Sequence, residues 1–366
     1  MTLYLIYFAV IFAAYMFIYG TQNTAEEISP EKHRRRDLFM VLISVGLWTL
    51  LVGLRSQEMG VDLDGYLPSY RAIGKLSFAD IWRLRSFLNY EKGYILLNKL
   101  LYMISPEPQL LLIVCTLVSV VPVGILIYKK SRKPFFSFLV YLGLPVMLVP
   151  FSALRQGIAV GITVLSWFFV EKKKPVKFII TVLFASFFHR SAIFFLIAYP
   201  LCNMRFKGVW QKIWKYGTVI LIPVAFLLRN QIYTLLAGLF YDDAPADNNG
   251  AYMLFIVFTA IYIFCLAIND RDDDSVNGYL NLFWIACICQ SMGGLKSTAQ
   301  RVGYYFMIYL AVALPNILTP PNTKVEKKLL LIMRCLILLI FAGYAIYTLS
   351  TATWAECNPY SFFWQD

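Results

Sequence analysis

The arrangement of the whole chain depends on one apolar stretch, FIITVLFASFFHRSAIFFLIAYPLC at residues 178–202. The stretch is long enough for one bilayer crossing, which needs about 20 apolar residues. Its centre holds His189 and Arg190, two ionisable side chains where a simple transmembrane helix has none. Each half, about 11 residues at ~1.5 Å per residue, reaches only halfway across the bilayer. We therefore predict a re-entrant pair of half-helices over 178–202, with His189 near the tip.

Basic residues on both sides of this stretch favour the hairpin. By the positive-inside rule, clusters of Lys and Arg between apolar runs mark the cytoplasm. With a hairpin, 21 of the 33 Lys and Arg residues are cytoplasmic, which gives net charges of +11 inside and +1 outside. A single span would move nine of these residues outside. We therefore expect both termini to be extracytoplasmic. The clusters lie at 33–36, 129–133, 172–177, 205–215 and 324–328.

The composition of the remaining chain is that of a membrane protein. Of 366 residues, 59% are apolar and 15% charged, whereas soluble domains have roughly 45–50% and 25%. This excludes a water-soluble globule and predicts an all-α, polytopic integral membrane protein with about ten transmembrane helices. We expect one membrane domain over 1–366, for which a GT-C-like helical bundle is one compatible arrangement. The ten apolar runs are 3–19, 38–54, 110–128, 135–151, 152–170, 217–236, 251–268, 280–293, 302–318 and 329–350.

The unusual polar residues gather on the predicted outer face. The longest segment between apolar runs, 55–92, is expected to be a large extracytoplasmic loop, and loops of this length are usually functional. Within it, Ser77 and Asp80 form a capping box that opens an amphipathic helix, predicted over 77–90 on the membrane surface. The aromatic tail, 351–366, is either an interfacial belt or a sugar-stacking surface.

Two arginines near the outer ends of apolar runs are candidates for a site. Arg155, followed by Gln156, lies inside the fifth run, and an arginine at membrane depth indicates function unless it extends to the headgroups. Arg301 precedes the ninth run, where an interface anchor is the alternative. Only two histidines are present and most of the seven cysteines lie in apolar runs, which argues against a zinc site and disulfides.

Short motifs distributed along the chain resemble the EpsG family of bacterial polysaccharide-biosynthesis membrane proteins, related in role to Wzy-type repeat-unit polymerases. Their order and spacing among the apolar runs carry the resemblance. Arg190 departs from the pattern, in which a small residue or proline stands between the histidine and the serine. The motifs are Gly53-Leu54-Arg55, Gly60-Val61-Asp62 with Tyr66, Glu91-Lys92-Gly93-Tyr94, Leu154-Arg155-Gln156-Gly157-Ile158-Ala159, Phe188-His189-Arg190-Ser191-Ala192, Arg301-Val302-Gly303-Tyr304-Tyr305 and Asn358-Pro359-Tyr360.

The resemblance implies a glycosyltransferase-type polymerase of exopolysaccharide, capsule or O-antigen. It would join undecaprenyl-pyrophosphate-linked oligosaccharide repeats, donor and acceptor, on the outer face of the bacterial plasma membrane. It implies no cofactor and no nucleic acid, and a chain-length regulator is a further expected partner. The pyrophosphate lipid leaves with negative charge, which guanidinium groups can bind in place of a metal ion.

These requirements assign roles to the candidate residues. Arg155 and Arg301 are expected to bind the pyrophosphate, followed by Arg55, with Gln156 as a further substrate ligand. The acceptor hydroxyl must lose a proton, and His189, Asp62 or Glu91 could accept it. The tyrosines could stack on or hydrogen-bond to sugars. They are Tyr66, Tyr304 and Tyr360.

The alternative from another class is a transporter, a flippase or exporter of the lipid-linked glycan. A carrier commonly has internal repeats and a cavity that opens to either side. The sequence contains no convincing repeat, and its unusual polar residues are one-sided, which favours the enzyme. A membrane acyltransferase using His189 as base is a further alternative.

Overall fold

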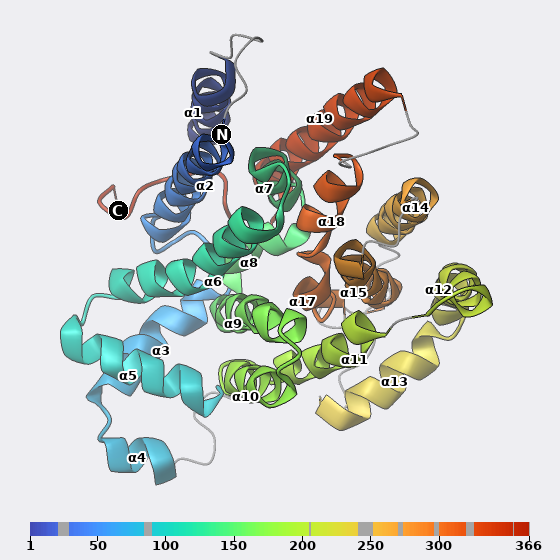
Figure 1. The fold of residues 1–366 in the computed structure, drawn as a ribbon. Helices are drawn as coiled ribbons and strands as arrows, with labels where there is room; N and C mark the ends of the chain where they lie inside the picture. Colours follow the sequence, from blue (N-terminus) through green and yellow to red (C-terminus); the bar gives the residue numbers. More distant parts are fainter. Residues whose placement is uncertain are drawn as a thin grey trace.

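The computed structural model describes residues 1–20, 29–83, 90–204, 206–240, 252–269, 274–295, 300–319, 326–353 and 355–365. These segments form a bundle of helices (Figure 1). They contain no strand, and their one isolated β-bridge joins Arg55 to Phe362. The all-α class is thus confirmed. Several features predicted from the sequence lie outside the described residues: 84–89 of the amphipathic helix, Arg205, Lys324 and Trp354.

The described helices follow one another as α1 (Thr2–Gly20), α2 (Pro30–Gly53), α3 (Leu63–Lys75), α4 (Phe78–Arg83), α5 (Lys92–Ile104), α6 (Gln109–Lys130), α7 (Pro134–Leu142), η1 (Pro145–Leu148), α8 (Val149–Ser152), α9 (Leu154–Glu171), α10 (Pro175–Ser186), η2 (Arg190–Ile197), α11 (Ala198–Asn203), α12 (Val209–Leu227), α13 (Arg229–Phe240), α14 (Met253–Ile268), α15 (Asp274–Gln290), α17 (Tyr304–Met307), α18 (Leu310–Ile317) and α19 (Lys327–Thr351), where η1 and η2 are 3₁₀ helices.

Among the described residues, five helices are long and apolar enough to cross a membrane: α1, α2, α6, α9 and α19. The number rises to seven if two bent pairs each count as one span. The chain bends by 75° between α7 and the η1–α8 segment, and by 78° between α12 and α13. Pro145 begins η1, where its ring cannot continue the preceding helix. These helices indicate a membrane protein, but the predicted count of about ten is not confirmed.

The stretch 178–202 folds into two arms. α10 forms the first arm, the chain turns at 187–189, and η2 with α11 forms the second. The ring of Phe178, near the start of α10, lies 5.4 Å from the ring of Tyr199 in α11 and 6.0 Å from that of Phe195. The arms are therefore antiparallel, with His189 at the turn. Insertion of this hairpin into a bilayer from one side remains a prediction.

The second arm returns to the end of the bundle from which the first arm departed. Asn281 of α15 donates a hydrogen bond to the carbonyl of Leu201 at 2.9 Å and accepts one from Trp214 at 3.0 Å. Two residues earlier on α15, the ring of Tyr279 lies 4.8 Å from that of Trp167, near the end of α9. The segments on either side of the hairpin thus lie at the same end of the molecule.

Three predicted basic clusters meet at this end, which we call the basic end (33–36, 129–133 and 172–177 with their contacts). Arg34 donates a hydrogen bond to Tyr128 at 3.1 Å, and Lys130 pairs with Glu171 at 2.6 Å. Arg132 donates to the carbonyl of Asn316 at 3.0 Å. Which side of the membrane this end faces remains a prediction.

Both termini lie at the opposite end of the bundle. The N-terminal ammonium of Met1 donates to Oδ1 of Asn358 at 3.0 Å, and Tyr4 donates to the carbonyl of Cys357 at 2.7 Å. The segment 55–92 begins at this end, where Arg55 pairs with Phe362. It forms α3, α4 and α5, so the predicted loop is largely helical where described.

The capping box of the predicted surface helix is confirmed. The hydroxyl of Ser77 donates to the Asp80 carboxylate at 2.6 Å, and the Asp80 N–H donates back to that hydroxyl at 3.1 Å. The described helix, α4, is short, and its Ile81 is buried against Ile73 and Ile95. The apolar side of α4 therefore packs on α3 and α5.

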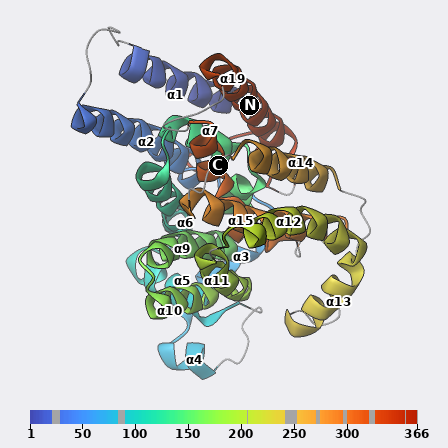
Figure 2. The same ribbon diagram turned by 45° about the vertical axis from the view of Figure 1, so that its right-hand side comes forward.

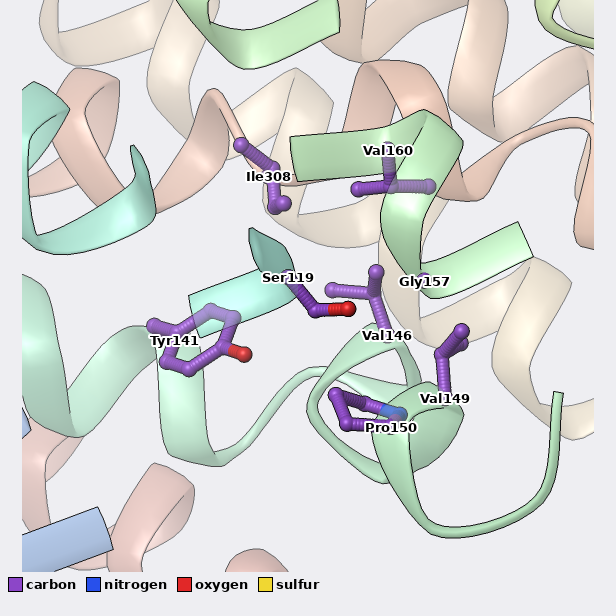
Figure 3. A pocket seen from close by; sticks show the side chains of 8 residues that line it. All are labelled: Ser119, Tyr141, Val146, Val149, Pro150, Gly157, Val160 and Ile308. Atoms are coloured by element: carbon purple, nitrogen blue, oxygen red, sulfur yellow. The ribbon is translucent and has the colours of Figure 1, made fainter. Parts of the chain in front are cut away.

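A small cavity lies among α6, α7, η1, α8, α9 and Ile308 at the end of α17 (Figure 3). Its volume is about 10 Å³, which is room for about one water molecule. The hydroxyl groups of Ser119 and Tyr141 point into it, while valines, Pro150 and Ile308 form most of its wall. The cavity is too small and too apolar to hold a sugar.

Candidate functional site

Glu91, directly before α5, is the centre of a cluster of charged side chains. Its Oε2 lies 2.5 Å from Nη1 of Arg155, at the start of α9. Its Oε1 accepts a hydrogen bond from the backbone N–H of Arg190 at 3.1 Å and lies 3.3 Å from Nδ1 of His189. One carboxylate thus joins the 55–92 segment, the first turn of α9 and the tip of the hairpin. We call Glu91, Arg155 and His189 the Glu91 cluster.

The Glu91 cluster is only partly accessible. The side chain of Glu91 is 8% exposed, that of Arg155 21% and that of His189 22%. Burial raises the pKa of Glu91, but the adjacent His189 imidazole and the positive charge of Arg155 outweigh this and lower it to about 2. Glu91 is therefore ionised at neutral pH and is a weak base.

Aromatic rings hold the Arg155 guanidinium in place. Its carbon lies 4.7 Å from the ring centroid of Tyr90 and 5.8 Å from that of Tyr66, and its Nε donates to the Tyr66 hydroxyl at 3.2 Å. Guanidinium groups stack well on aromatic faces. Sequence reasoning missed Tyr90, although its position directly before Glu91 in the loop could have indicated a role.

Asp62 lies at the edge of the same group of residues. It precedes α3 by one residue, is partly exposed, and stands one turn before Tyr66. Burial raises the pKa of Tyr66 to about 12 against the opposing effect of Arg155, and the Asp62 carboxylate adds to the increase. The structure therefore brings Asp62 near the Glu91 cluster through Tyr66, whose hydroxyl accepts the hydrogen bond from Arg155.

The segment 301–305 packs beside the cluster. Gln156 donates a hydrogen bond through Nε2 to the carbonyl of Arg301 at 2.9 Å. The hydroxyl groups of Ser191 and Tyr305 are 3.0 Å apart, which joins this segment to the hairpin. Tyr304 is buried, so its ring supports the wall of the site. The structure thus brings Arg155 and His189 together at Glu91 and places the backbone of Arg301 against Gln156. Sequence reasoning missed the Ser191–Tyr305 contact.

Arg55 and Tyr360 lie apart from the Glu91 cluster. Arg55 is fully buried, and its guanidinium donates to the carbonyls of Val52, Met59, Pro150 and Phe151. Tyr360 donates to the carbonyl of Leu51 at 2.8 Å. Both residues attach the C-terminal tail and α8 to the end of α2, and the Arg55 guanidinium is not exposed to a substrate.

Two glycines of the motifs allow close backbone approach around the site. A Cβ atom at Gly93 would lie 2.5 Å from Cδ1 and 2.6 Å from the carbonyl oxygen of Phe187, which accepts a hydrogen bond from the Gly93 N–H at 2.9 Å. Gly60 has φ +127°, and a Cβ there would lie 2.1 Å from the Phe151 oxygen. Gly93 therefore lets the hairpin turn approach Glu91, and Gly60 positions the segment that leads to Asp62.

Few side chains that could serve as metal ligands lie together in the described part of the chain. Within the described ranges, no three or more His, Cys, Asp or Glu side chains are grouped so that they could hold a metal ion. The charged groups that do converge are an arginine, a carboxylate and a histidine. This set suits recognition of an anionic, hydroxyl-bearing substrate.

An all-helical bundle with membrane-length apolar helices and a polar cluster at one end defines a polytopic membrane protein with a candidate active site at that end. The EpsG family model matches residues 38–362, nearly the whole chain, and the chain belongs to the EpsG family, a family of Wzy-like polymerases. No curated protein and no solved structure matches it. The Glu91 cluster and the Arg301 segment lie within the matched range.

Proposed function

We propose that this protein joins undecaprenyl-pyrophosphate-linked oligosaccharide repeats on the outer face of the bacterial plasma membrane, and that the Glu91 cluster is its active site. Family membership supports polysaccharide polymerisation, which implies lipid-linked oligosaccharide substrates. The observation that carries the assignment of the site is the contact of one carboxylate with both Arg155 and His189. The cluster lies at the end opposite to the basic end, as the positive-inside rule requires of an outer-face site.

Arg155 is the proposed ligand of the leaving pyrophosphate. It lies in the first turn of α9, whose 18-residue helix directs its positive N-terminal end at the same place. Its guanidinium is partly exposed and held by Tyr66 and Tyr90, so little reorganisation is needed when charge develops on the phosphate. Arg301, beside Gln156, is the proposed second cation.

His189 is the proposed general base. With its Nδ1 facing Glu91, the imidazole can donate Nδ1–H to the carboxylate and keep Nε2 available to accept a proton. The acceptor hydroxyl oxygen forms a bond to the anomeric carbon of the donor, and its proton passes to Nε2. The bond from that carbon to the pyrophosphate oxygen breaks, and the lipid pyrophosphate leaves with both electrons. No step in this scheme requires a metal ion.

The other predicted residues receive narrower roles. Glu91 orients His189 and Arg155, since a carboxylate with a pKa of about 2 is a poor base. Tyr66 and Tyr90 are the proposed sugar-facing rings. We propose that Arg55 and Tyr360 stabilise the fold and that Tyr304 supports the site wall, so none of the three contacts substrate.

A purified-protein assay tests this function. The full chain receives lipid-linked oligosaccharide with no other enzyme, and the products are resolved by size. We expect longer glycans from the natural protein and a ~10²–10³-fold lower rate from Arg155→Ala. His189→Ala should lower the rate ~10²–10⁴-fold. Arg71→Ala, an exposed α3 residue, is the matched control.

The same assay separates the polymerase from the transporter. Elongation by the purified protein means catalysis, whereas movement of labelled lipid across vesicles without elongation means a carrier. Retention of full-length polymer by both Arg155→Ala and His189→Ala would remove the Glu91 cluster from the mechanism. A chain-length regulator, if required, would change the product length and leave the dependence on Arg155 unchanged.

A further inference from the structure

A further arginine, Arg229, lies at the same end of the bundle as the Glu91 cluster. Arg229 is the first residue of α13, at the 78° bend after α12. Trp214, near the start of α12, contacts α15 at the basic end. The 19-residue helix α12 therefore carries Arg229 to the opposite end, and α13 then turns away from α12 along the edge of the molecule (Figure 2).

The Arg229 guanidinium lies against the rings of Phe226 and Tyr252. We call these three residues the Arg229 niche. Its carbon lies 4.4 Å from the ring centroid of Phe226 and 5.5 Å from that of Tyr252. Nη1 donates to the Phe226 carbonyl at 2.8 Å, and Nε donates to the Tyr252 hydroxyl at 3.3 Å. Phe255 stacks on the other face of Phe226 at 5.1 Å and fixes that ring.

The niche holds a positive charge with no negative partner among the described residues. The contacts of Arg229 in this part of the chain are a backbone carbonyl, a hydroxyl and two rings, none of which neutralises it. Arg155 differs, because Glu91 pairs with it. A half-buried guanidinium of this kind favours a phosphate-bearing ligand, which its planar fork can bind through two hydrogen bonds.

Large exposed apolar side chains lie on the helices that carry the niche. Leu227 is 72% exposed, and Leu228 beside it is also exposed. Further along, α12 exposes Ile220 and α13 exposes Leu235. A long isoprenoid chain can pack along this apolar surface while the phosphate group of the same lipid reaches Arg229.

The niche is connected to the Arg301 segment through packed residues. Tyr252 lies against Gly294, where a Cβ atom would come within 2.4 Å of the ring. At Gly293, a Cβ atom would lie 2.3 Å from Oε1 of Gln300, the neighbour of Arg301. Arg301 in turn accepts the hydrogen bond from Gln156. A ligand at Arg229 would therefore lie on the approach to the Glu91 cluster from the α12–α13 side.

We propose that the Arg229 niche binds the pyrophosphate group of the second of the two lipid-linked substrates, while Arg155 binds the first. This inference rests on the proposed function, because only a reaction between two lipid-linked molecules needs two such sites. An ordinary phospholipid headgroup offers the same phosphate chemistry, and the experiment must distinguish the two sources.

The test counts bound lipids on the purified full chain by native mass spectrometry. The probes are undecaprenyl pyrophosphate without glycan and, separately, phosphatidylglycerol. We expect two undecaprenyl pyrophosphates on the natural protein and on Arg71→Ala, and one on Arg229→Ala or Arg155→Ala. Tyr252→Phe keeps the ring, loses the hydroxyl and should weaken the second binding event severalfold, which guards against a misfolded Arg229 variant.

Two outcomes would overturn the niche. One is two undecaprenyl pyrophosphates bound to a folded Arg229→Ala protein. The other is equal displacement of the second molecule by phosphatidylglycerol, which would make the niche an ordinary lipid contact. Two molecules could bind as expected while the natural protein does not elongate the glycan. In that case the polymerase function fails and the binding site stands.

Discussion

At the scale of single residues, Glu91 determines the state of its neighbours. Its two oxygens face Arg155 on one side and the hairpin tip on the other, so its charge sets both the direction of the imidazole and the position of the guanidinium. A neutral side chain of the same shape would keep the packing and remove that control. The pH dependence of the reaction is the most direct measure of this role.

Glu91→Gln should lower the rate at every pH of the assay range. Because the pKa of Glu91 is about 2, the carboxylate is ionised throughout this range. The neutral amide removes the negative charge that faces Arg155 and the hairpin tip, and we expect a rate at least ~10-fold lower. An unchanged rate, or a loss confined to one end of the pH range, would contradict this role of Glu91.

The stability contribution of Glu91 has a definite sign. The folded-state pKa lies below the ordinary value of 4.5, so this contribution is complete above about pH 4.5 and is lost as the pH falls towards 2. Glu91→Gln should therefore lower the thermal unfolding midpoint at neutral pH. The difference from the natural protein should shrink on acidification.

Arg55→Ala should lower the thermal unfolding temperature and leave the KM for substrate unchanged. The substitution leaves the carbonyl groups of Val52, Met59, Pro150 and Phe151 without this donor, and each such loss costs ~1–3 kcal/mol. We expect the free energy of unfolding to fall by at least ~4 kcal/mol in total, measured by thermal unfolding in detergent. Arg71→Ala is the control. Undiminished stability with a raised KM would instead make Arg55 a substrate ligand.

Individual residues of the site could be recognised from the sequence to different extents. Arg155 and His189 stand out because ionisable residues are rare in apolar runs. Arg55 directly follows an apolar run and was predicted as a further phosphate ligand, yet its guanidinium donates to backbone carbonyl groups, which only the path of residues 150–151 reveals. Tyr90 is marked only by its position directly before Glu91, and Ser191 carries no comparable signal, since serine is common in hairpin turns.

At the scale of elements, breaks in helices give the bundle its site. The break at His189 was visible in the sequence because charge interrupts an apolar run. The bends after α7 and α12 were not, because prolines and glycines also occur within continuous transmembrane helices. Run length alone therefore predicted about ten spans, whereas five described helices, or seven with the bent pairs, are of membrane length.

Gly93→Val should separate the hairpin from α5. The added Cβ would overlap Phe187, including its backbone oxygen, which cannot move without the turn moving. His189 would then leave Glu91, and we expect a rate loss approaching that of His189→Ala in the size-resolved polymer assay. Gly46→Val is the matched control, because a Cβ at Gly46 meets nothing within 4 Å.

Phe187→Ala combined with Gly93→Val gives a second check on the hairpin. Removing the ring relieves the contact with Cδ1 but leaves the contact with the carbonyl oxygen. The double variant should therefore recover little activity. Full activity in Gly93→Val alone would show that the turn can move without loss of function.

At the scale of the whole molecule, charge is separated between two ends. The basic end holds 33–36, 129–133 and 172–177, and the opposite end holds the Glu91 cluster, Arg229 and both termini. The sequence could predict this separation because topology depends on summed charge, which needs no knowledge of packing. It could not predict the contact between Met1 and Asn358, which depends on how α1 and α19 meet.

Cysteine labelling in intact cells tests the orientation of the two ends. Of the seven natural cysteines, only Cys335 is exposed, so replacing it by alanine gives a suitable background. Asp64→Cys and Lys207→Cys place single thiols at exposed positions, one in α3 and one after the hairpin. A membrane-impermeant maleimide should label the first in intact cells and the second only after the membrane is opened.

Because a single crossing by 178–202 would carry residue 207 to the outside, external labelling of Lys207→Cys would show that the hairpin does not return to the cytoplasm. Protection of Asp64→Cys in intact cells would place the Glu91 cluster on the wrong side of the membrane for polymerisation at the outer face.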